Sequence, residues 1–172
     1  MHYLDHAATT PVLPEVRDVV LSFLESDFGN PSSVHSYGRA ARRGVGDGRE
    51  RIAAAIGASP TEIVFTAGGT EADNLALKGV ASKLKAHANH MITSAAEHHA
   101  VLESAHQLER DGYEISVLKV GTDGLIDPDT LRSAVRRTTA LVSIMAVNNE
   151  VGTVQDIVTL CDAVKEVNPR TL

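Results

Sequence analysis

The feature that most constrains the fold of this chain is the alternation of short apolar runs with longer amphipathic ones. Short β-branched runs predict strands, and runs with an apolar residue every three or four positions predict helices. The predicted strands cover residues 62–67, 90–95, 113–120 and 139–147, and the predicted helices cover 14–27, 39–56, 74–86, 100–111, 128–136 and 156–167. This order is typical of an α/β fold, in which a mainly parallel sheet is flanked by helices on both faces.

Composition and charge exclude several classes of protein. The chain has 172 residues, of which 43% are hydrophobic, and this is enough for one domain with a real core. A formal net charge of −6 disfavours a nucleic-acid binder, and no apolar run is long enough to span a membrane. The single cysteine, Cys161, excludes an internal disulfide and lies in a helical pattern that predicts a small buried residue. We therefore expect a cytoplasmic protein without direct nucleic-acid or membrane contacts.

Local signals define several element boundaries. Residues 28–38, FGNPSSVHSYG, are rich in Gly, Pro, Asn and Ser and predict an ordered loop or an active-site lid. Gly57 is expected to end the helix before it, and Asp127 is expected to cap the helix after it. Thr171 and Leu172 follow an Asn-Pro stop and are expected to begin a further strand.

Polar clusters follow three of the predicted strands. They are TAGGT at 66–70 after EIVF, EHHA at 97–100 after MITS, and NNEVG at 148–152 after IMAV. Ligands of mainly parallel sheets bind beyond the C-terminal ends of the strands. The three clusters are therefore expected to converge on one ligand site at that edge of the sheet.

The glycine pair in TAGGT opens a predicted helix. The first backbone N–H groups of a helix have no partner within it and carry a partial positive charge, so they can hold a phosphate. Gly68 and Gly69 would allow a ligand to approach the backbone closely. Thr70 is the expected N-cap, with Asp73 in a loose capping box. The alternative is that the glycines only form a strand-to-helix turn.

Two other kinds of site are compatible with short motifs. GVGDG at 44–48 is superficially similar to a dinucleotide-binding fingerprint, but it lies within a predicted helix rather than after a strand. His98, His99, Glu103 and His106 could form a metal site, since the last three share one helix face. Ordinary surface histidines explain this spacing, so no metal site is expected. The arginines between 39 and 51 are expected to form a solvated helix face.

Five blocks of the sequence, in order, resemble cysteine desulfurases of the NifS/IscS type. The blocks are YLDHAATTPVLPEV at 3–16, FGNPSSVHSYGRAAR at 28–42, EIVFTAGGTEADNLALKG at 62–79, ITSAAEHHAVLE at 92–103 and LVSIMAVNNEVGTVQDI at 141–157. The resemblance implies the aspartate-aminotransferase-like fold (type I) and the cofactor pyridoxal 5'-phosphate. It implies removal of sulfur from L-cysteine, which leaves L-alanine and an enzyme persulfide for iron–sulfur cluster assembly or for thiolation of tRNA or cofactors. Enzymes acting on selenocysteine or cysteine sulfinate share much of the pattern.

The resemblance also assigns roles to single residues. It implies that Gly69 and Thr70 hold the cofactor's phosphate and that Asn149 hydrogen-bonds its phenolic oxygen. It implies that His98 stacks on the pyridine ring and assists proton transfer, the alternative being a histidine that only caps the next helix. Asn148 and Glu150 are expected to be structural supports.

The segments near the N-terminus belong, in the family, to the substrate entrance and the dimer interface. Ala8, Thr9 and Asn30 are therefore expected to neighbour the substrate. Residues 1–14 would join the small domain, and 15–172 would be the N-terminal part of the cofactor-binding large domain, with the remainder absent. The resemblance further implies a homodimer and sulfur-acceptor proteins as partners.

Essential groups of the family are not found in their expected contexts. None of the five lysines lies in the S-x-H-K stretch that carries the Schiff-base lysine, and Cys161 is not in the context of the persulfide cysteine. This chain alone is therefore expected to be inactive. The alternative is a shortened, non-catalytic paralogue that acts as a binding or assembly module for a desulfurase or scaffold partner.

Overall fold

The computed structural model describes residues 2–172, which form two compact units. The first extends to Phe65, and the second is Thr66–Leu172. Each unit has its own secondary structure and its own internal contacts. Among the helices of residues 2–172, none combines the length and the apolar character needed to cross a membrane.

The first unit contains two long helices and one short turn. Helix α1 covers Pro14–Glu25, α2 covers Ser36–Ile56, and the 3-10 turn η1 covers Pro60–Glu62. Helix α2 ends at Gly57, whose φ of 70° is in the left-handed region, as predicted. The GVGDG motif lies inside α2, so the dinucleotide-binding alternative fails.

The loop between α1 and α2 is ordered, as its composition predicts. A Cβ atom at Gly29 would collide with the carbonyl of Tyr37, and one at Gly38 would collide with the carbonyl of Ser33. The ring of Tyr37 stacks on that of Phe28, with 5.6 Å between the ring centroids. Glycine is needed at both positions because the loop folds back on the first turn of α2.

The predicted strand 62–67 is wrong. Within residues 2–172, this segment pairs with none of the strands of the sheet. An extended segment becomes a strand only when a neighbour takes up its N–H and C=O groups. Here the guanidinium of Arg49 donates to the carbonyl of Ile63 and lies 4.8 Å from the centroid of the Phe65 ring. Arg49 is therefore more than part of a solvated face.

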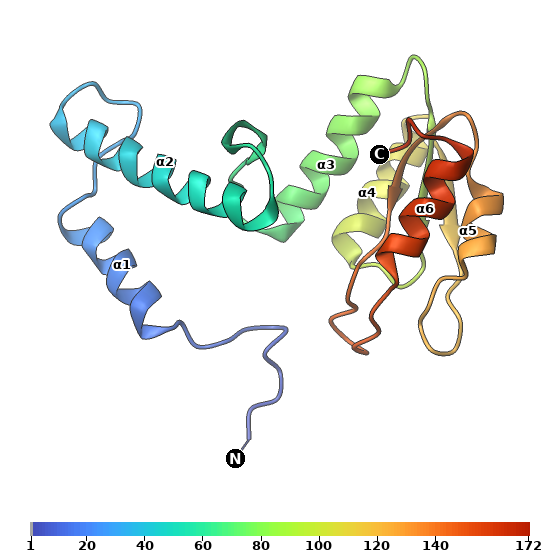
Figure 1. The fold of residues 1–172 in the computed structure, drawn as a ribbon, viewed down its shortest axis with the longest axis horizontal. Helices are drawn as coiled ribbons and strands as arrows, with labels where there is room; N and C mark the ends of the chain where they lie inside the picture. The colour runs from blue at the N-terminus through green and yellow to red at the C-terminus, as the bar shows by residue number, and fades with distance from the viewer. Residues whose placement is uncertain (1) are drawn as a thin grey trace. The chain divides into compact units, whose positions relative to one another are not determined.

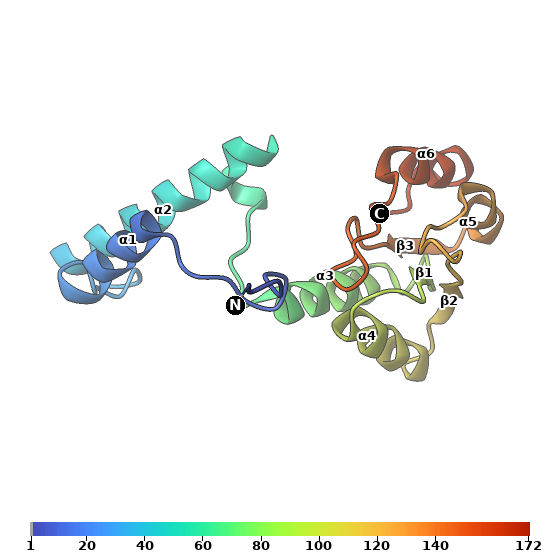
Figure 2. The same cartoon turned by 90° about the horizontal axis from the view of Figure 1, so that it is seen from below.

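The second unit has the predicted α/β architecture. Strands β1 (His90–Ser94), β2 (Glu114–Leu118) and β3 (Thr139–Ser143) form a parallel sheet in the order β2-β1-β3. Figures 1 and 2 show the helices around this sheet. They are α3 (Gly69–Leu84), α4 (His99–Arg110), α5 (Pro128–Ala134) and α6 (Ile157–Val167).

The central strand β1 separates two apolar clusters. Met91 packs with residues of α3 and α4, while its neighbour Ile92 packs with residues of α5 and α6. Successive side chains of a strand point to opposite faces, so β1 contributes to both clusters and is buried throughout. Helices therefore cover both faces of the sheet, as the sequence predicts (Figure 2).

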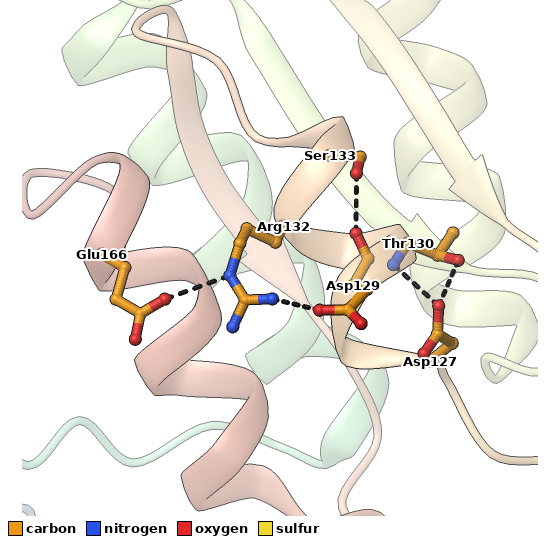
Figure 3. Close-up of polar contacts among 6 residues, drawn as sticks. All are labelled: Asp127, Asp129, Thr130, Arg132, Ser133 and Glu166. Carbon is orange, nitrogen blue, oxygen red and sulfur yellow. Dashed lines mark hydrogen bonds and ion pairs between the residues drawn. The ribbon is translucent and has the colours of Figure 1, made fainter.

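Side-chain contacts fix α5 and join it to α6 (Figure 3). The Asp127 carboxylate accepts hydrogen bonds from the hydroxyl and the backbone N–H of Thr130, at 2.6 and 2.9 Å, which confirms the predicted cap. These bonds hold the pKa of Asp127 below its ordinary value. The guanidinium of Arg132 bridges Asp129 on its own helix and Glu166 on α6.

The last residues of the chain pair with β3, as expected of a further strand. The N–H of Leu172 donates to the carbonyl of Ala140 at 3.0 Å, and the N–H of Val142 donates to the carbonyl of Leu172 at 2.8 Å. The prediction for Cys161 is wrong, because its side chain is exposed. The core-facing positions of α6 are taken by Leu160 and Val164.

Candidate active site

A cleft lies beyond the C-terminal ends of the three strands, where the sequence predicts a ligand site. Its volume is about 610 Å³. We call it the strand-end cleft. It is lined by residues 95–99 after β1, by 120–124 after β2, and by residues of 148–153 after β3. Two of the three predicted polar clusters therefore meet in this cleft.

A second cleft, which we call the helix cleft, lies between α3 and α4 and has a volume of about 490 Å³. Thr70, Asn74 and Lys78 line it from α3. His98 and His99 line both this cleft and the strand-end cleft. His98 is thus the common neighbour of Thr70 in one cleft and of Asn149 in the other, while Gly69 immediately precedes Thr70 in the chain.

His98 is the N-cap of α4, as in the alternative interpretation of its sequence. Its Nδ1 atom accepts a hydrogen bond from the N–H of Ala100 at 3.1 Å. In a neutral imidazole the proton is then on Nε2, because one ring nitrogen donates and the other accepts. Capping therefore leaves one N–H donor of His98 for a ligand, so the cap and a ring contact are compatible.

The predicted cap of α3 is wrong, because the helix begins earlier than expected. Gly68, not Thr70, is the N-cap, and its carbonyl accepts from the N–H of Ala72 at 3.1 Å. The acid that reaches back is Glu71 rather than Asp73, since Oε2 of Glu71 accepts from the N–H of Ala67 at 2.7 Å. Thr70 therefore lies within the first turn of the helix.

The start of α3 has the properties of an anion site. Within residues 2–172, no protein hydrogen bond uses the backbone N–H of Gly69 or Thr70. A Cβ atom at Gly68 or Gly69 would meet no protein atom within 4 Å, so the space around this helix end is open. Unpaired N–H groups and the positive end of the helix dipole suit a phosphate.

The loop after β3 is organised by Asn148 and presents Asn149. The Asn148 side-chain oxygen accepts from the N–H groups of Glu150 and Val151, both at 2.9 Å. Its amide nitrogen donates to the carbonyl of Ala96 at 3.0 Å. The prediction that Asn148 supports the structure is confirmed. Asn149 itself is exposed and lines the strand-end cleft.

Glu97 is a residue of the site that sequence reasoning missed. It is half-buried, and its Oε1 atom accepts from the N–H of Met145 at 2.5 Å. Burial raises the pKa of Glu97, Asp73 raises it further, and the hydrogen bond from Met145 opposes this. The signal in the sequence was its place in the EHHA cluster at 97–100, directly before His98, but the sequence assigned it no role of its own.

The predicted substrate neighbours lie in the first unit. The N–H groups of Ala8 and Thr9 donate to the carbonyl of Asp5 in a local turn, at 3.2 and 3.3 Å. The side-chain oxygen of Asn30 accepts from the N–H of Ser32 at 2.9 Å. These bonds account for local structure only, and the contact of Ala8, Thr9 and Asn30 with a substrate stays a prediction.

The structure does not gather the residues of the metal-site alternative. Across residues 2–172, no group of three or more His, Cys, Asp or Glu side chains could hold a metal ion. His99 and Glu103 line the helix cleft without His106. The helical spacing that suggested a metal site does not bring these side chains to one centre.

The donors around the two clefts suit a ligand with a phosphate and a second oxygen acceptor. The free N–H groups at the start of α3 and the Thr70 hydroxyl are donors for an anion. The Nε2 atom of His98 and the side-chain amide of Asn149 add further hydrogen-bond donors. The residues present therefore fit pyridoxal phosphate.

Comparison with known proteins agrees with this fit. The family described as aminotransferase class-V matches residues 2–171. A cysteine desulfurase IscS of Dictyoglomus turgidum is 52% identical over 164 residues, which are 95% of this chain and 42% of that protein. Class-V aminotransferases, including cysteine desulfurases, use pyridoxal phosphate as their cofactor.

Two solved structures have the same fold. One is described as a NifS-like protein, with a TM-score of 0.95 and 38% identity over 98% of this chain and 46% of the other. The second is SspA in complex with cysteine, with a TM-score of 0.91 and 39% identity over 96% of this chain and 48% of the other. The chain thus spans less than half the length of these relatives. It belongs to the class-V aminotransferase family, and its relatives are cysteine desulfurases of the IscS/NifS type.

Proposed function

We propose that the protein containing this chain is a pyridoxal-phosphate-dependent cysteine desulfurase. It removes sulfur from L-cysteine, leaves L-alanine, and holds the sulfur as an enzyme persulfide for iron–sulfur cluster assembly or for thiolation of tRNA or cofactors. The observation that carries the proposal is the position of His98, which lines one cleft with Thr70 and the other with Asn149. Relatives named as cysteine desulfurases, aligned over 95% of the chain, support it.

Each site residue has one role in this proposal. Gly69 and Thr70 bind the phosphate through backbone N–H groups and a hydroxyl. Asn149 would donate a hydrogen bond to the phenolic oxygen, and His98 would contact the ring and hold at Nε2 the proton that is transferred. When bound, pyridoxal phosphate supplies an electron-withdrawing ring that stabilises negative charge on the amino acid.

The partners of the whole protein are part of the proposal. L-cysteine is the substrate, and the SspA structure in complex with cysteine supports this choice. A homodimer and sulfur-acceptor proteins are expected from the resemblance alone. The Schiff-base lysine and the persulfide cysteine would be encoded downstream of Leu172, which nucleotide sequencing of the gene would establish. The shortened binding module is not favoured, because the curated relative is an enzyme.

Alanine formation tests the proposal. The full-length protein is incubated with L-cysteine, pyridoxal phosphate and a thiol reductant, and alanine and sulfide are measured over time. We expect both products in equal amounts and no product from residues 1–172 alone. Absence of alanine from the full-length protein at saturating cofactor would contradict the desulfurase function, and turnover by residues 1–172 alone would contradict the assigned division of the catalytic groups.

A further inference from the structure

The loop that carries His98 is tied to the segment that carries Asn149 by two hydrogen bonds. The first runs from the N–H of Met145 to Oε1 of Glu97, at 2.5 Å and across 48 positions of sequence. The second runs from the side-chain amide of Asn148 to the carbonyl of Ala96, at 3.0 Å and across 52 positions. The two bonds join the same two segments, one just after β1 and one just after β3.

The residues that form these bonds are direct neighbours of the two cofactor residues. Glu97 precedes His98, and Asn148 precedes Asn149. In each pair, the first side chain is half-buried and bound to the other segment, while the second is exposed to the strand-end cleft. A shift of either segment would therefore change the separation of His98 and Asn149.

Of the two hydrogen bonds, the one from Met145 to Glu97 is expected to be stronger than the one from Asn148 to Ala96. Its carboxylate accepts a backbone N–H in a partly buried place, and hydrogen bonds to a charged acceptor are stronger than neutral ones. Asn148 also holds the turn of its own loop through Glu150 and Val151, so its replacement would disturb more than the tie. Glu97 makes only the bond to Met145 among the side-chain hydrogen bonds of residues 2–172.

We infer that Glu97 is a positioning residue, which fixes His98 relative to Asn149 by binding the N–H of Met145. The inference rests on the proposed function, because it assigns Glu97 a role through two residues proposed to hold the cofactor. Catalytic groups must be held within about 0.5 Å of their productive geometry, and such precision depends on supporting hydrogen bonds. Without the tie, the His98 loop would sample several positions, and cofactor binding would weaken.

Three substitutions in the full-length protein test this role. Glu97→Gln keeps an oxygen acceptor at the same place, Glu97→Ala removes it, and Glu97→Asp keeps the charge but withdraws the carboxylate from Met145. Glu109→Ala is the matched control, because Glu109 is an exposed acid on α4. Each protein is titrated with pyridoxal phosphate, and the ring signal of His98 is recorded by NMR without the cofactor.

The expected pattern distinguishes the tie from a merely structural contact. Loss of one charge-assisted hydrogen bond should raise the dissociation constant of pyridoxal phosphate about tenfold in Glu97→Ala and Glu97→Asp. The His98 signal should broaden or split in both. Glu97→Gln keeps an oxygen acceptor but not its charge, so it should retain the parent's His98 signal and bind pyridoxal phosphate with an affinity between those of the parent and Glu97→Ala. Glu109→Ala should match the parent in both measurements.

Two results would overturn the inference. One is a Glu97→Ala protein that binds pyridoxal phosphate as tightly as the parent. The other is an unchanged His98 signal in Glu97→Ala or, if that protein does not fold, in Glu97→Asp. A parent protein that does not bind pyridoxal phosphate would instead refute the proposed function, and the His98 signal, recorded without cofactor, would still decide whether the tie exists.

Discussion

Single residues at the clefts combine a structural bond with a free functional group. His98 caps α4 with Nδ1 and leaves Nε2 available to a ligand, so one imidazole could serve two uses. The helix start at Gly68 likewise leaves the N–H groups of Gly69 and Thr70 without protein partners. A substitution at such a position changes both stability and ligand binding, unless the new residue retains the structural hydrogen bond.

Replacement of His98 by asparagine separates the two uses. Asparagine is a strong N-cap, so we expect His98→Asn to leave the free energy of unfolding within about 1 kcal/mol of the parent. Loss of the imidazole should slow alanine formation by about 100-fold or more, as for other general acid–base residues. Urea denaturation and alanine assays on the full-length protein provide the measurements. A rate within threefold of the parent would show that only the cap matters.

At the scale of secondary structure, a buried histidine joins the three strands of the sheet. His90 in β1 is completely buried, and its ring nitrogens lie 2.8 Å from the hydroxyl of Thr139 in β3 and 2.9 Å from that of Ser116 in β2. Burial lowers the pKa of His90, nearby Arg136 lowers it further, and Glu114 partly opposes this. The sheet therefore disfavours the protonated form of His90.

This network predicts a loss of stability in weak acid. Because the pKa of His90 is lower in the native state than the unfolded value of about 6.5, the unfolded chain binds more protons in the interval between the two. Stability should be fully present above that interval and should fall as the pH falls through it. Thermal melting between pH 7.5 and pH 5 should show this fall, and His90→Gln should reduce it.

His90→Gln must be compared with the parent protein, because Glu97 has the opposite effect on the pH dependence of stability. Its raised pKa means that the native state binds the extra proton, so its contribution to stability decreases as the pH rises. His87→Gln is the control, since His87 is exposed. If acidification lowers the melting temperatures of His90→Gln and of the parent by the same amount, His90 is not the group responsible.

At the scale of the whole molecule, the apolar core holds the strands from which the loops of the strand-end cleft extend. In residues 66–172, two clusters enclose the sheet, and Leu131 of α5 is completely buried in one of them. The loops of the strand-end cleft start directly from the buried strands. Loosening this core should therefore displace the loops that line the strand-end cleft as well as destabilise the fold.

Truncation of Leu131 tests this dependence. Leu131→Ala should lower the free energy of unfolding by about 2–5 kcal/mol, because it removes buried methyl groups and leaves a cavity. Leu24→Ala, at a side chain that is 70% exposed in α1, should change it by less than about 0.5 kcal/mol. Urea denaturation measures both, and hydrogen exchange of the β1 amides localises the effect. Equal changes for the two variants would contradict the assigned core.

The predictions from sequence succeeded where short-range patterns decide and failed where distant contacts decide. The helices, three of the four strands and the Asp127 cap follow from spacing and from side chains that bond within three or four residues. Segment 62–67 has the composition of a strand, but its carbonyl at Ile63 is bound by Arg49 instead of a neighbouring strand. Cys161 follows a helical pattern, yet it lies outside the face that α6 buries.

The amino-acid sequence by itself therefore determined the α/β order, the strand-end location of the site and the family resemblance, because each depends on residues close together in the chain. Only the tertiary structure decided that α3 begins at Gly68, that His98 is shared by two clefts, and that Glu97 binds Met145. The last two features depend on contacts between segments far apart in the chain, at the cleft between α3 and α4 and between the segments after β1 and β3, and no local pattern encodes such contacts. The start of α3 depends instead on local bonds of Gly68 and Glu71, which the helical spacing alone did not locate.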